Sequence, residues 1–516
     1  MAGENLGVCG ECQRRVPAEH IIRDGQVYLR KNCPDCGPNE ALISTHAAAW
    51  QRKREVCHYE GEPIACSLRC ESCDRSIHHP RMVFLDVTNR CNMNCPICIN
   101  NTPGMGFVFN PPLSYFERVL TWLAQMDPPP LVQLFGGEPT VRDDLLQIIQ
   151  MGRDRGLDMR VVTNGLKLAD EEYCRRLCES KVHVLIAFDG HDRDIYRRLR
   201  GNAAAYDKKL QALENLRKHS RHKNTIMCCV ARHINDVHMG GLIRYCHDNR
   251  DHIKCMHLIP LTETWQPGEF ETDVATTTED VEAIMDAAFP DERCEFVPAG
   301  ITKYVQRAAR FIGSGARLKF GGVHPNCESG TYLLSDGERY HPLGSYLKRP
   351  LLEVAEQFVS RARKLDEKLA GLDPDRWTHR WRGRLLVLSS LLPLLLRSLD
   401  SRKILRGNRL MAVLRILGGL LVGKRLKDQL RKHTNLQDAM LMIVLPFEEP
   451  DSIESARLQN CFAGFAYIDP DTDEVTTMPV CVWGIYQRDI QSRITEKYGE
   501  DEVTSVARGG QTTGAT

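Results

Sequence analysis

Six short apolar runs recur along the middle of the chain, and amphipathic segments separate them. The runs cover residues 82–88, 131–135, 159–163, 182–188, 224–230 and 255–260. Segments 142–156 and 205–220 carry apolar positions at helical spacing among polar and charged ones. Strands that alternate with helices predict a parallel sheet, and six repeats predict an α/β fold with a partial (β/α)6 barrel over residues 81–310. In such a fold the chemistry lies at the C-terminal ends of the strands.

The pattern changes on both sides of the barrel. Residues 1–50 predict a four-cysteine module of the rubredoxin or zinc-ribbon kind, residues 51–80 an auxiliary cysteine segment, and residues 311–360 an irregular connector. Residues 361–435 predict an apolar and basic helical segment, residues 436–504 an α+β C-terminal extension with further cysteines, and residues 505–516 a disordered tail. We therefore expect a barrel placed between a small metal-binding module and an α+β extension.

Composition narrows the possible classes of protein. The 516 residues imply two to four domains, and the formal net charge of +1 gives no support for a nucleic-acid partner. The start of the chain has neither a basic segment nor an apolar run, and no run reaches the roughly 20 apolar residues of a membrane span, so we expect a cytoplasmic protein. In that reducing compartment, 21 cysteines favour metal ligands over disulfides.

Three cysteines follow the first predicted strand with the spacing Cys91-x3-Cys95-x2-Cys98. Three thiolates can hold a [4Fe-4S] cluster and leave one iron without a protein ligand. The open iron can chelate the amino and carboxylate groups of S-adenosylmethionine (SAM). An electron from the cluster then breaks the sulfonium C–S bond of SAM and releases a 5′-deoxyadenosyl radical.

Three further motifs stand at the ends of the next three strands, namely GGEP at 136–139, TNG at 163–165 and FDG at 188–190. The two glycines of the first motif allow backbone to approach a ligand closely. We expect Glu138 to accept a hydrogen bond from the SAM ammonium group, Asp189 to bind ribose hydroxyls, and Ile97 to lie against the adenine. The predicted SAM-binding residues are Ile97, Gly136, Gly137, Glu138, Pro139, Thr163, Asn164 and Asp189.

Together CNMNCPIC, GGEP, TNG and FDG resemble the motifs of the radical SAM superfamily over about residues 82–260. The resemblance implies a partial (β/α)6 barrel, SAM as cosubstrate, and cluster ligation by Cys91, Cys95 and Cys98. The alternative is a structural zinc site beside unrelated glycine turns. Four motifs that fall in order at strand ends favour the enzyme.

The remaining cysteines form further groups. Cys9-x2-Cys12 and Cys33-x2-Cys36 predict a tetrahedral four-sulfur site for zinc or iron, which the spacing does not distinguish. We assign a second group to an auxiliary metal site, because no apolar strand leads into it although part of it repeats the C-x3-C-x2-C spacing. Its members are Cys57, Cys66, Cys70 and Cys73.

Three late cysteines, Cys327, Cys461 and Cys481, are expected to meet beside the barrel mouth as ligands of an auxiliary [4Fe-4S] cluster. The alternative for the last two is a pair of small core residues in a hairpin. Another set falls in helix and strand patterns and predicts core positions: Cys174, Cys178, Cys228, Cys229 and Cys246.

The segment 376–432 contains fifteen Arg or Lys residues and only two acidic ones. Its apolar runs, 385–399 and 410–423, are interrupted by Pro393 and Arg415, so neither is expected to span a bilayer. Apolar helices with flanking positive charge suit an anionic membrane surface or a slot for long acyl chains. The alternative is a buried helical pair whose basic residues face solvent.

The layout as a whole resembles the tetraether lipid synthases, with Arg457-x3-Cys461 and Pro479-x-Cys481 near the end of the chain. That resemblance implies several [4Fe-4S] clusters, a rubredoxin-like iron in the N-terminal module, and coupling of lipid tails. The basic helical segment departs from the pattern of that group.

The sequence thus predicts a radical SAM enzyme that takes hydrogen from an unactivated C–H bond of a lipid or another long apolar substrate, with C–C coupling of tails favoured. A low-potential donor such as ferredoxin or flavodoxin would supply electrons, and the inner membrane surface would be a peripheral contact. The alternatives are a peptide- or protein-modifying enzyme with auxiliary clusters, a methylase of a small cofactor such as a pterin that uses a second SAM, and a metal-binding scaffold without turnover.

Overall fold

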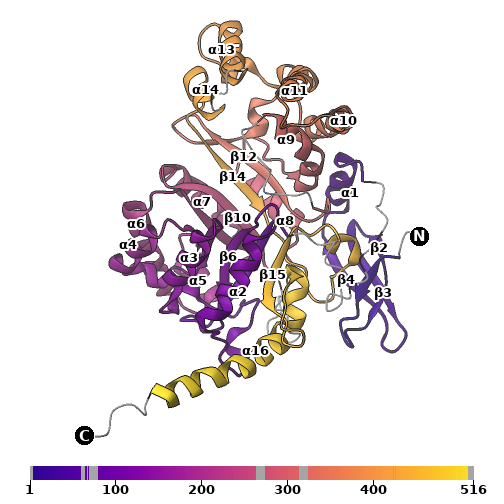
Figure 1. Cartoon of the computed structure of the whole chain (residues 1–516). Coiled ribbons are helices and arrows are strands. Elements are labelled where there is room, and N and C mark those ends of the chain that lie inside the picture. Colours follow the sequence, from indigo (N-terminus) through magenta and orange to yellow (C-terminus); the bar gives the residue numbers. More distant parts are fainter. Residues whose placement is uncertain are drawn as a thin grey trace.

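The computed structural model describes residues 4–59, 64, 66, 68, 80–262, 274–312, 323–421, 424 and 426–509. A small antiparallel sheet near the N-terminus lies beside a large curved sheet, and a layer of helices lies at one end of the molecule (Figure 1). The large sheet carries the predicted barrel.

Six parallel strands form the centre of the large sheet, which confirms the predicted α/β fold. They are β5 (Met82–Thr88), β6 (Leu131–Gly136), β7 (Asp158–Thr163), β8 (His183–Ala187), β9 (Asn224–Val230) and β10 (Ile253–Pro260). The helices that follow them are α2 (Leu113–Ala124), α3 (Leu145–Asp154), α4 (Glu171–Glu179), α5 (Arg193–Arg200), α6 (Ala205–His219), α7 (Met239–Asp248) and α8 (Thr278–Ala287). Helices α2 to α7 cover the outer face of the strands (Figure 1).

The C-terminal extension does not stand apart from the barrel. One of its strands, β14 (Asp438–Val444), pairs in parallel with β10, and another, β15 (Ala463–Ile468), pairs in parallel with β5 at the opposite edge. Antiparallel strands β12 (Ser329–Ser335) and β16 (Val475–Pro479) then flank these two. The short strands β11 (Val297–Pro298) and β13 (Tyr340–Pro342) pair with β12. The segment 311–360, predicted to be an irregular connector, therefore supplies strands to the main sheet.

The N-terminal module is a four-stranded antiparallel sheet followed by one helix. Its elements are β1 (Leu6–Val8), β2 (Arg15–Arg23), β3 (Gln26–Cys33), β4 (Gly37–Ser44) and α1 (Ala47–Val56). The module docks onto the C-terminal extension through buried Glu454, which accepts hydrogen bonds from Asn5 at 2.7 Å and interacts with the His20 ring at 3.2 Å. Contacts between residues about 450 positions apart thus join the N-terminal module to the C-terminal extension.

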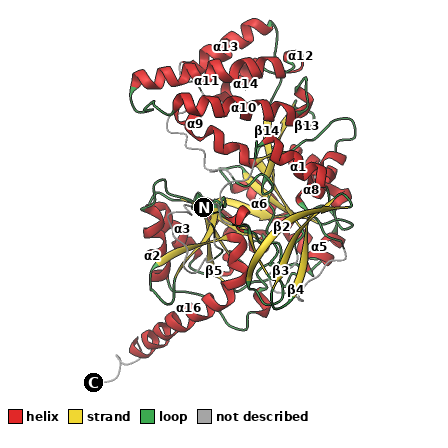
Figure 2. Cartoon of the chain, turned by 90° about the vertical axis from the view of Figure 1, so that its right-hand side faces the viewer, coloured by secondary structure: helices red, strands yellow, loops and turns green. Residues whose placement is uncertain are grey.

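A helical layer lies at the end of the molecule away from the C-terminus (Figures 1 and 2). It contains α9 (Gln306–Ile312), α10 (Leu351–Leu369), α11 (Trp377–Ser398), α12 (Ser401–Ile404), α13 (Arg409–Leu421) and α14 (Leu426–His433). Phe311, Leu365 and Val387 form part of a small core separate from that of the barrel. In the described part of the chain, no helix has the length and apolar character needed to cross a bilayer.

The last helix, α16 (Val480–Gly509), is anchored on the first barrel strand. Three of its side chains, Trp483, Gln487 and Gln491, donate hydrogen bonds of 2.8–3.1 Å to one oxygen of Asp86, whose other oxygen is buried without a partner. Burial raises the pKa of Asp86 to about 7 although these donors oppose the shift. Residues 505–509, predicted as part of a disordered tail, are the end of this helix, and residues 510–516 lie outside the described part.

Asp86→Asn is expected to flatten the dependence of stability on pH. The unfolded chain loses the Asp86 proton near pH 4 and the folded chain only near pH 7, so this group reduces stability as pH rises through that window, by on the order of 1.4 kcal/mol per pH unit. Above pH 7 the loss is complete, and the neutral amide avoids it while keeping an oxygen for the three donors. Thermal unfolding from pH 5 to pH 8 measures the difference between variant and wild type.

The matched control is Asp86→Ala, which leaves three buried donors unpaired and should lower the melting temperature at every pH. A constant difference between Asp86→Asn and wild type across the pH range would contradict the expectation.

Candidate active site and metal centres

The loop after β5 presents the three motif cysteines. The Asn89 side chain joins the two ends of this loop. It donates a hydrogen bond to the Phe107 carbonyl at 2.8 Å and accepts one from the Phe109 amide at 2.9 Å. Cys91 is exposed, and Cys95 and Cys98 are half-buried. The Cys98 amide donates to the Cys95 carbonyl at 3.1 Å, which turns the chain between these two ligands.

The three thiols interact electrostatically, which shows that they lie near one another. Burial raises the pKa of Cys91 to about 12, and the nearby Cys98 and Cys95 add to the shift. Their sulfur atoms do not all lie within 4.8 Å of one another, so they do not form a compact site for a single ion. The Cys91 thiol, which loses its proton only beside a compensating cation, fits a cluster ligand.

The glycines of GGEP lie directly against the start of the cysteine loop. A Cβ atom at Gly137 would lie 2.4 Å from the Arg90 carbonyl oxygen, and one at Gly136 would lie 2.3 Å from that of Thr88. The amides of Gly137 and Glu138 donate to these same two carbonyls at 2.8 and 2.9 Å. The close approach that the sequence assigned to a ligand is therefore made, in part, to the backbone that leads into Cys91.

Glu138 connects the ends of two strands. Its buried carboxylate accepts hydrogen bonds from the Thr163 hydroxyl at 2.7 Å and the Asn164 amide at 2.6 Å, besides two donors from Thr140. Asn164 in turn donates to the Asn92 side chain at 2.7 Å, within the cysteine motif. The structure thus joins GGEP, TNG and the cysteine loop through Glu138, and a SAM ammonium group would have to share its oxygens.

Asp189 is hydrogen-bonded to protein groups, and its binding of ribose hydroxyls stays a prediction. It is fully buried, forms a two-pronged ion pair with Arg200 at 2.7 and 2.8 Å, and accepts from the Cys229 amide at 3.0 Å. Burial lowers the pKa of nearby Lys209 to about 8, and its ammonium group donates to the carbonyls of Asn164 and Ala187 at 2.6 Å. Arg200 and Lys209 act electrostatically on Cys95, so two cations stand beside the thiol group.

Two other predicted SAM-binding residues are packed into the protein. Ile97 belongs to the main apolar core, and Pro139 is buried in the short 3-10 turn after β6. Thr163 is buried at the end of β7, with its hydroxyl turned toward Glu138. These residues shape the walls of the site rather than its exposed surface.

The N-terminal module brings four cysteines together in one site. Ligand atoms of Cys9, Cys12, Cys33 and Cys36 all lie within 4.8 Å of one another, and Cys12 and Cys33 sulfurs are 3.6 Å apart. Hydrogen bonding from the Cys12 backbone is the main factor that lowers the pKa of Cys9 to about 6, which favours a metal-binding thiolate. This confirms the predicted four-sulfur site, and its geometry fits a tetrahedral ion.

Two protein-family matches fall on two parts of the structure, the barrel and the N-terminal module. Residues 85–246 match the radical SAM superfamily, and residues 2–45 match the HMPTM N-terminal zinc ribbon domain. The barrel region of the chain is similar to the radical SAM superfamily. The prediction of a radical SAM enzyme is thereby confirmed, and the N-terminal match favours zinc in the four-cysteine site.

Two curated relatives show the range of the superfamily. The chain is 31% identical over 280 residues to 7,8-dihydro-6-hydroxymethylpterin dimethyltransferase of Methanocaldococcus jannaschii, over 52% of this chain and 55% of that protein. It is 31% identical over 131 residues to PqqA peptide cyclase of Rhodopseudomonas palustris, over 25% of this chain and 34% of that protein. The chain thus spans about half or less of the length of these relatives.

Among solved structures, SuiB of Streptococcus suis bound to S-adenosylmethionine is similar, with 13% sequence identity and a TM-score of 0.36. The alignment covers 58% of this chain and 70% of that one.

The three late cysteines of this radical SAM protein meet beside one buried arginine. Cys327 precedes β12, Cys461 precedes β15 and Cys481 lies in the first turn of α16, and each thiol affects the pKa of another. Arg457 lies 3.1 Å from Glu448 and acts on Cys327 and Cys481. The fold therefore brings together residues that are up to 154 positions apart in sequence.

The second cysteine group is described only in part. Cys57 is buried at the end of α1, where burial raises its pKa to about 12, and its sulfur lies beside Gly300. Cys66 is buried in the main core. Cys70 and Cys73 lie outside the described residues.

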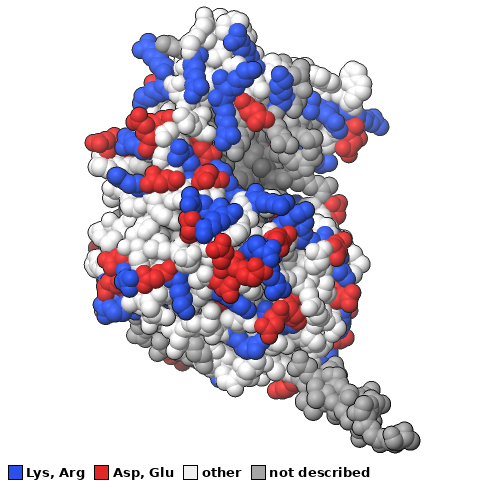
Figure 3. Space-filling model, turned by 90° about the vertical axis from the view of Figure 1, so that its left-hand side faces the viewer, with Lys and Arg blue, Asp and Glu red and all other residues white. Residues whose placement is uncertain are grey.

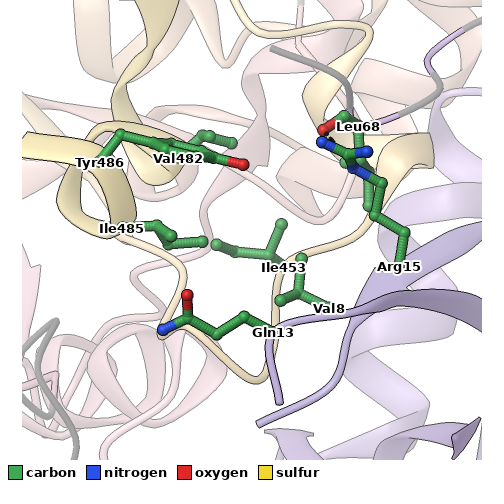
Figure 4. A pocket seen from close by; sticks show the side chains of 8 residues that line it. All are labelled: Val8, Gln13, Arg15, Leu68, Ile453, Val482, Ile485 and Tyr486. Atoms are coloured by element: carbon green, nitrogen blue, oxygen red, sulfur yellow. Dashed lines mark hydrogen bonds between the residues drawn. The ribbon is translucent and has the colours of Figure 1, made fainter. Parts of the chain in front are cut away.

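A small cavity links the four-cysteine module to the helix that begins beside Cys481 (Figure 4). Gln13 and Arg15, which follow Cys12, face Val482 and Tyr486 of α16 across it. The Arg15 guanidinium also donates to the Leu68 carbonyl at 3.1 Å. The N-terminal metal module therefore packs against the segment that supplies the last of the late cysteines.

Sequence reasoning missed Arg200 and Lys209. Lys209 occupies the buried stripe of α6 together with Ala212, Leu213 and Leu216, so a charged residue at an apolar position was the available signal. Arg200 ends α5 before Gly201 and had no such signal.

Gly137→Ala is expected to abolish cluster binding, because its Cβ would overlap the Arg90 carbonyl at the base of the cysteine loop. Iron content and formation of 5′-deoxyadenosine under reducing conditions should both fall by at least about tenfold. Such a change corresponds to a loss of ~1.4 kcal/mol in the free energy of cluster binding. Gly241→Ala is the matched control, since nothing lies within 4 Å of a Cβ there. Equal iron content in both variants would refute the expectation.

Cys12→Ser combined with Cys36→Ser should remove about one zinc ion per chain, because each substitution takes one ligand from the tetrahedral site. Iron bound through Cys91, Cys95 and Cys98 should be retained. Elemental analysis of the anaerobically purified protein measures both metals, with Cys174→Ala as a control for loss of a buried core cysteine. Loss of iron in place of zinc would instead identify a rubredoxin-like centre.

Proposed function

We propose that this chain is a radical SAM methylase that acts on a carbon atom of a small, polar heterocyclic cofactor of the pterin class. One observation carries the proposal: the chain combines a zinc ribbon of the HMPTM type with 31% identity to a pterin dimethyltransferase over 280 residues. The match spans far more of the chain than the match to the peptide cyclase does. The comparisons thus support the cofactor-methylase alternative better than the lipid substrate that the sequence favoured.

Polar side chains line the inner face of the barrel near the starts of its strands. Pairing of Arg160 with His183 and of Leu185 with Thr225 puts alternate residues of β7, β8 and β9 on one face. Their neighbours Val161, Val184 and Ile226 are fully buried on the other face, in the main core that the strands share with residues of the helices. Thr225 is hydrogen-bonded to the His183 ring at 3.0 Å.

Two histidines on this inner face are held neutral. Burial lowers the pKa of His183 to about 3 and that of His257 to about 4, and the nearby charges of Lys254 and Arg160 contribute. His183 Nδ1 and Arg160 Nε are buried without a hydrogen-bond partner among the described residues. Both groups stand near the starts of β7 and β8, at the opposite ends of the strands from the cysteine loop, so they form a polar floor of the barrel. A polar floor suits a polar substrate better than an alkyl chain, which would leave buried polar groups unpaired at a cost of roughly 1–3 kcal/mol each.

Catalysis would begin at the C-terminal ends of the strands. When bound, a [4Fe-4S] cluster with one open iron supplies the electron that cleaves SAM to methionine and a 5′-deoxyadenosyl radical. Cys91, Cys95 and Cys98 would hold the cluster, and Glu138 fixes the neighbouring loops in place. Arg200 and Lys209 stabilise negative charge near Cys95.

The late cysteines would hold an auxiliary [4Fe-4S] cluster. Cys327, Cys461 and Cys481 offer three half-buried thiols, and the Arg457 guanidinium supplies a compensating positive charge. Burial raises the pKa of Cys461 to about 12, so its thiolate needs a cation nearby. These features fit a cluster that relays electrons rather than a mononuclear ion.

The test is an anaerobic reaction of reduced enzyme with SAM and 7,8-dihydro-6-hydroxymethylpterin. A product heavier by one CH2 group, together with 5′-deoxyadenosine, is expected by mass spectrometry. SAM with a deuterated methyl group shows whether SAM is also the methyl donor. The triple variant Cys91→Ala, Cys95→Ala, Cys98→Ala should form neither product, whereas Cys174→Ala should form both. If 5′-deoxyadenosine accumulates and reduced pterins stay unmodified, the proposed substrate class is wrong.

A further inference from the structure

Helix α11 exposes a continuous apolar stripe to solvent. Trp377, Trp381, Leu385 and Leu395 are among its exposed large apolar residues, with Trp377 71% and Leu385 59% exposed. At 100° per residue, these four and the half-buried Leu388 and Leu392 fall within about 80° of arc on one side of the helix. The helix therefore has two apolar faces, and only one of them is used in the protein.

The other face of α11 fixes the helix on the layer below it. Gly383 lies so close to Phe311 of α9 that a Cβ atom would overlap the ring, and Arg384 donates to the Phe311 carbonyl at 2.9 Å. Val387 and Leu394 are buried on the same side. The stripe cannot turn inward without breaking these contacts, so its exposure is a property of the fold.

Helix α13 adds a second exposed apolar set to this layer. Leu410, Met411 and Leu414 are 45–68% exposed. Together α11 and α13 hold eight of the thirteen large apolar side chains that are exposed in the described part of the chain. We name the exposed apolar residues of these two helices the apolar patch; they are Trp377, Trp381, Leu385, Leu395, Leu396, Leu410, Met411 and Leu414.

The segment that carries the apolar patch is rich in cations. Residues 376–432 carry fifteen Arg or Lys and two acidic residues, and Lys and Arg side chains gather over the helical layer in Figure 3. Arg382, Arg397 and Arg415 form no ion pair with any residue that the structure describes. Elsewhere on the molecule, surface arginines such as Arg175 and Arg217 are paired with carboxylates on their own helices.

We infer that the apolar patch is a peripheral binding site for an anionic membrane surface. Exposed Trp and Leu side chains would enter the boundary between lipid headgroups and acyl chains, and the unpaired arginines would contact acidic headgroups. Two tryptophans at the start of α11 suit this boundary, because an indole ring has an apolar body and a polar N–H. Nothing in the patch spans a bilayer, so binding is reversible and depends on salt. This inference is independent of the proposed substrate.

Flotation with lipid vesicles tests the inference on the full-length protein. Wild type should bind vesicles of phosphatidylcholine with 30% phosphatidylglycerol at least about tenfold more strongly than vesicles of phosphatidylcholine alone, since each basic residue near the surface contributes about 1 kcal/mol. High salt should remove this difference. Trp377→Gln with Leu385→Gln should reduce binding to the anionic vesicles by about tenfold or more.

The matched control is Val237→Gln, which removes an exposed apolar side chain (84% exposed) from the barrel and should leave vesicle binding unchanged. The melting temperature and SAM cleavage of the double variant should equal those of wild type, because both residues lie outside the core. Absence of wild-type binding to anionic vesicles overturns the inference. So does a dimer in solution that the double variant converts to monomer without vesicle binding, because the patch would then bind a second copy of the chain.

Discussion

The buried carboxylate of Glu138 is the interaction on which the candidate active site depends. It accepts hydrogen bonds from residues that follow two neighbouring strands, while the backbone around it lies against the base of the cysteine loop. Each strand is rigid because of its place in the sheet, but the loops between strands and helices have no such support. One fully hydrogen-bonded group converts three separate loops into a single rigid surface. Gly136 and Gly137 make this possible because no other residue fits against the loop backbone.

Negative charges around the site are balanced by neighbouring cations. Cys95 and Asp189 carry or develop negative charge in a buried setting, and Arg200 and Lys209 provide the cations that offset it. A buried ion pair contributes little net stability, but removal of one partner is costly because it leaves the other charge uncompensated. The ion pair with Asp189 therefore holds the Arg200 guanidinium next to Cys95, a predicted cluster ligand. Its contribution is the position of this charge rather than the stability of the barrel.

Sequence patterns predicted what depends on local spacing and missed what depends on distant contacts. The six barrel strands were predicted because each is an apolar run with polar boundaries, and the four-cysteine site because its ligands lie in two close pairs. The pairing of β15 with β5 joins residues about 380 positions apart, and no local pattern encodes it. Asp189 was read as a free ligand for ribose, since its partner Arg200 was indistinguishable in sequence from a solvent-exposed helix residue.

The position of β15 has a consequence for how the protein is made. The edge of the parallel sheet at β5 stays open until residues 463–468 have left the ribosome, because these residues form the strand that covers it. Exposed strand edges of this kind favour aggregation of nascent chains. Synthesis must therefore be followed by a late closing step, in which the end of the chain returns to the strand that leads into the cysteine loop. Truncations from the C-terminus would leave the catalytic half of the molecule with its first strand uncovered.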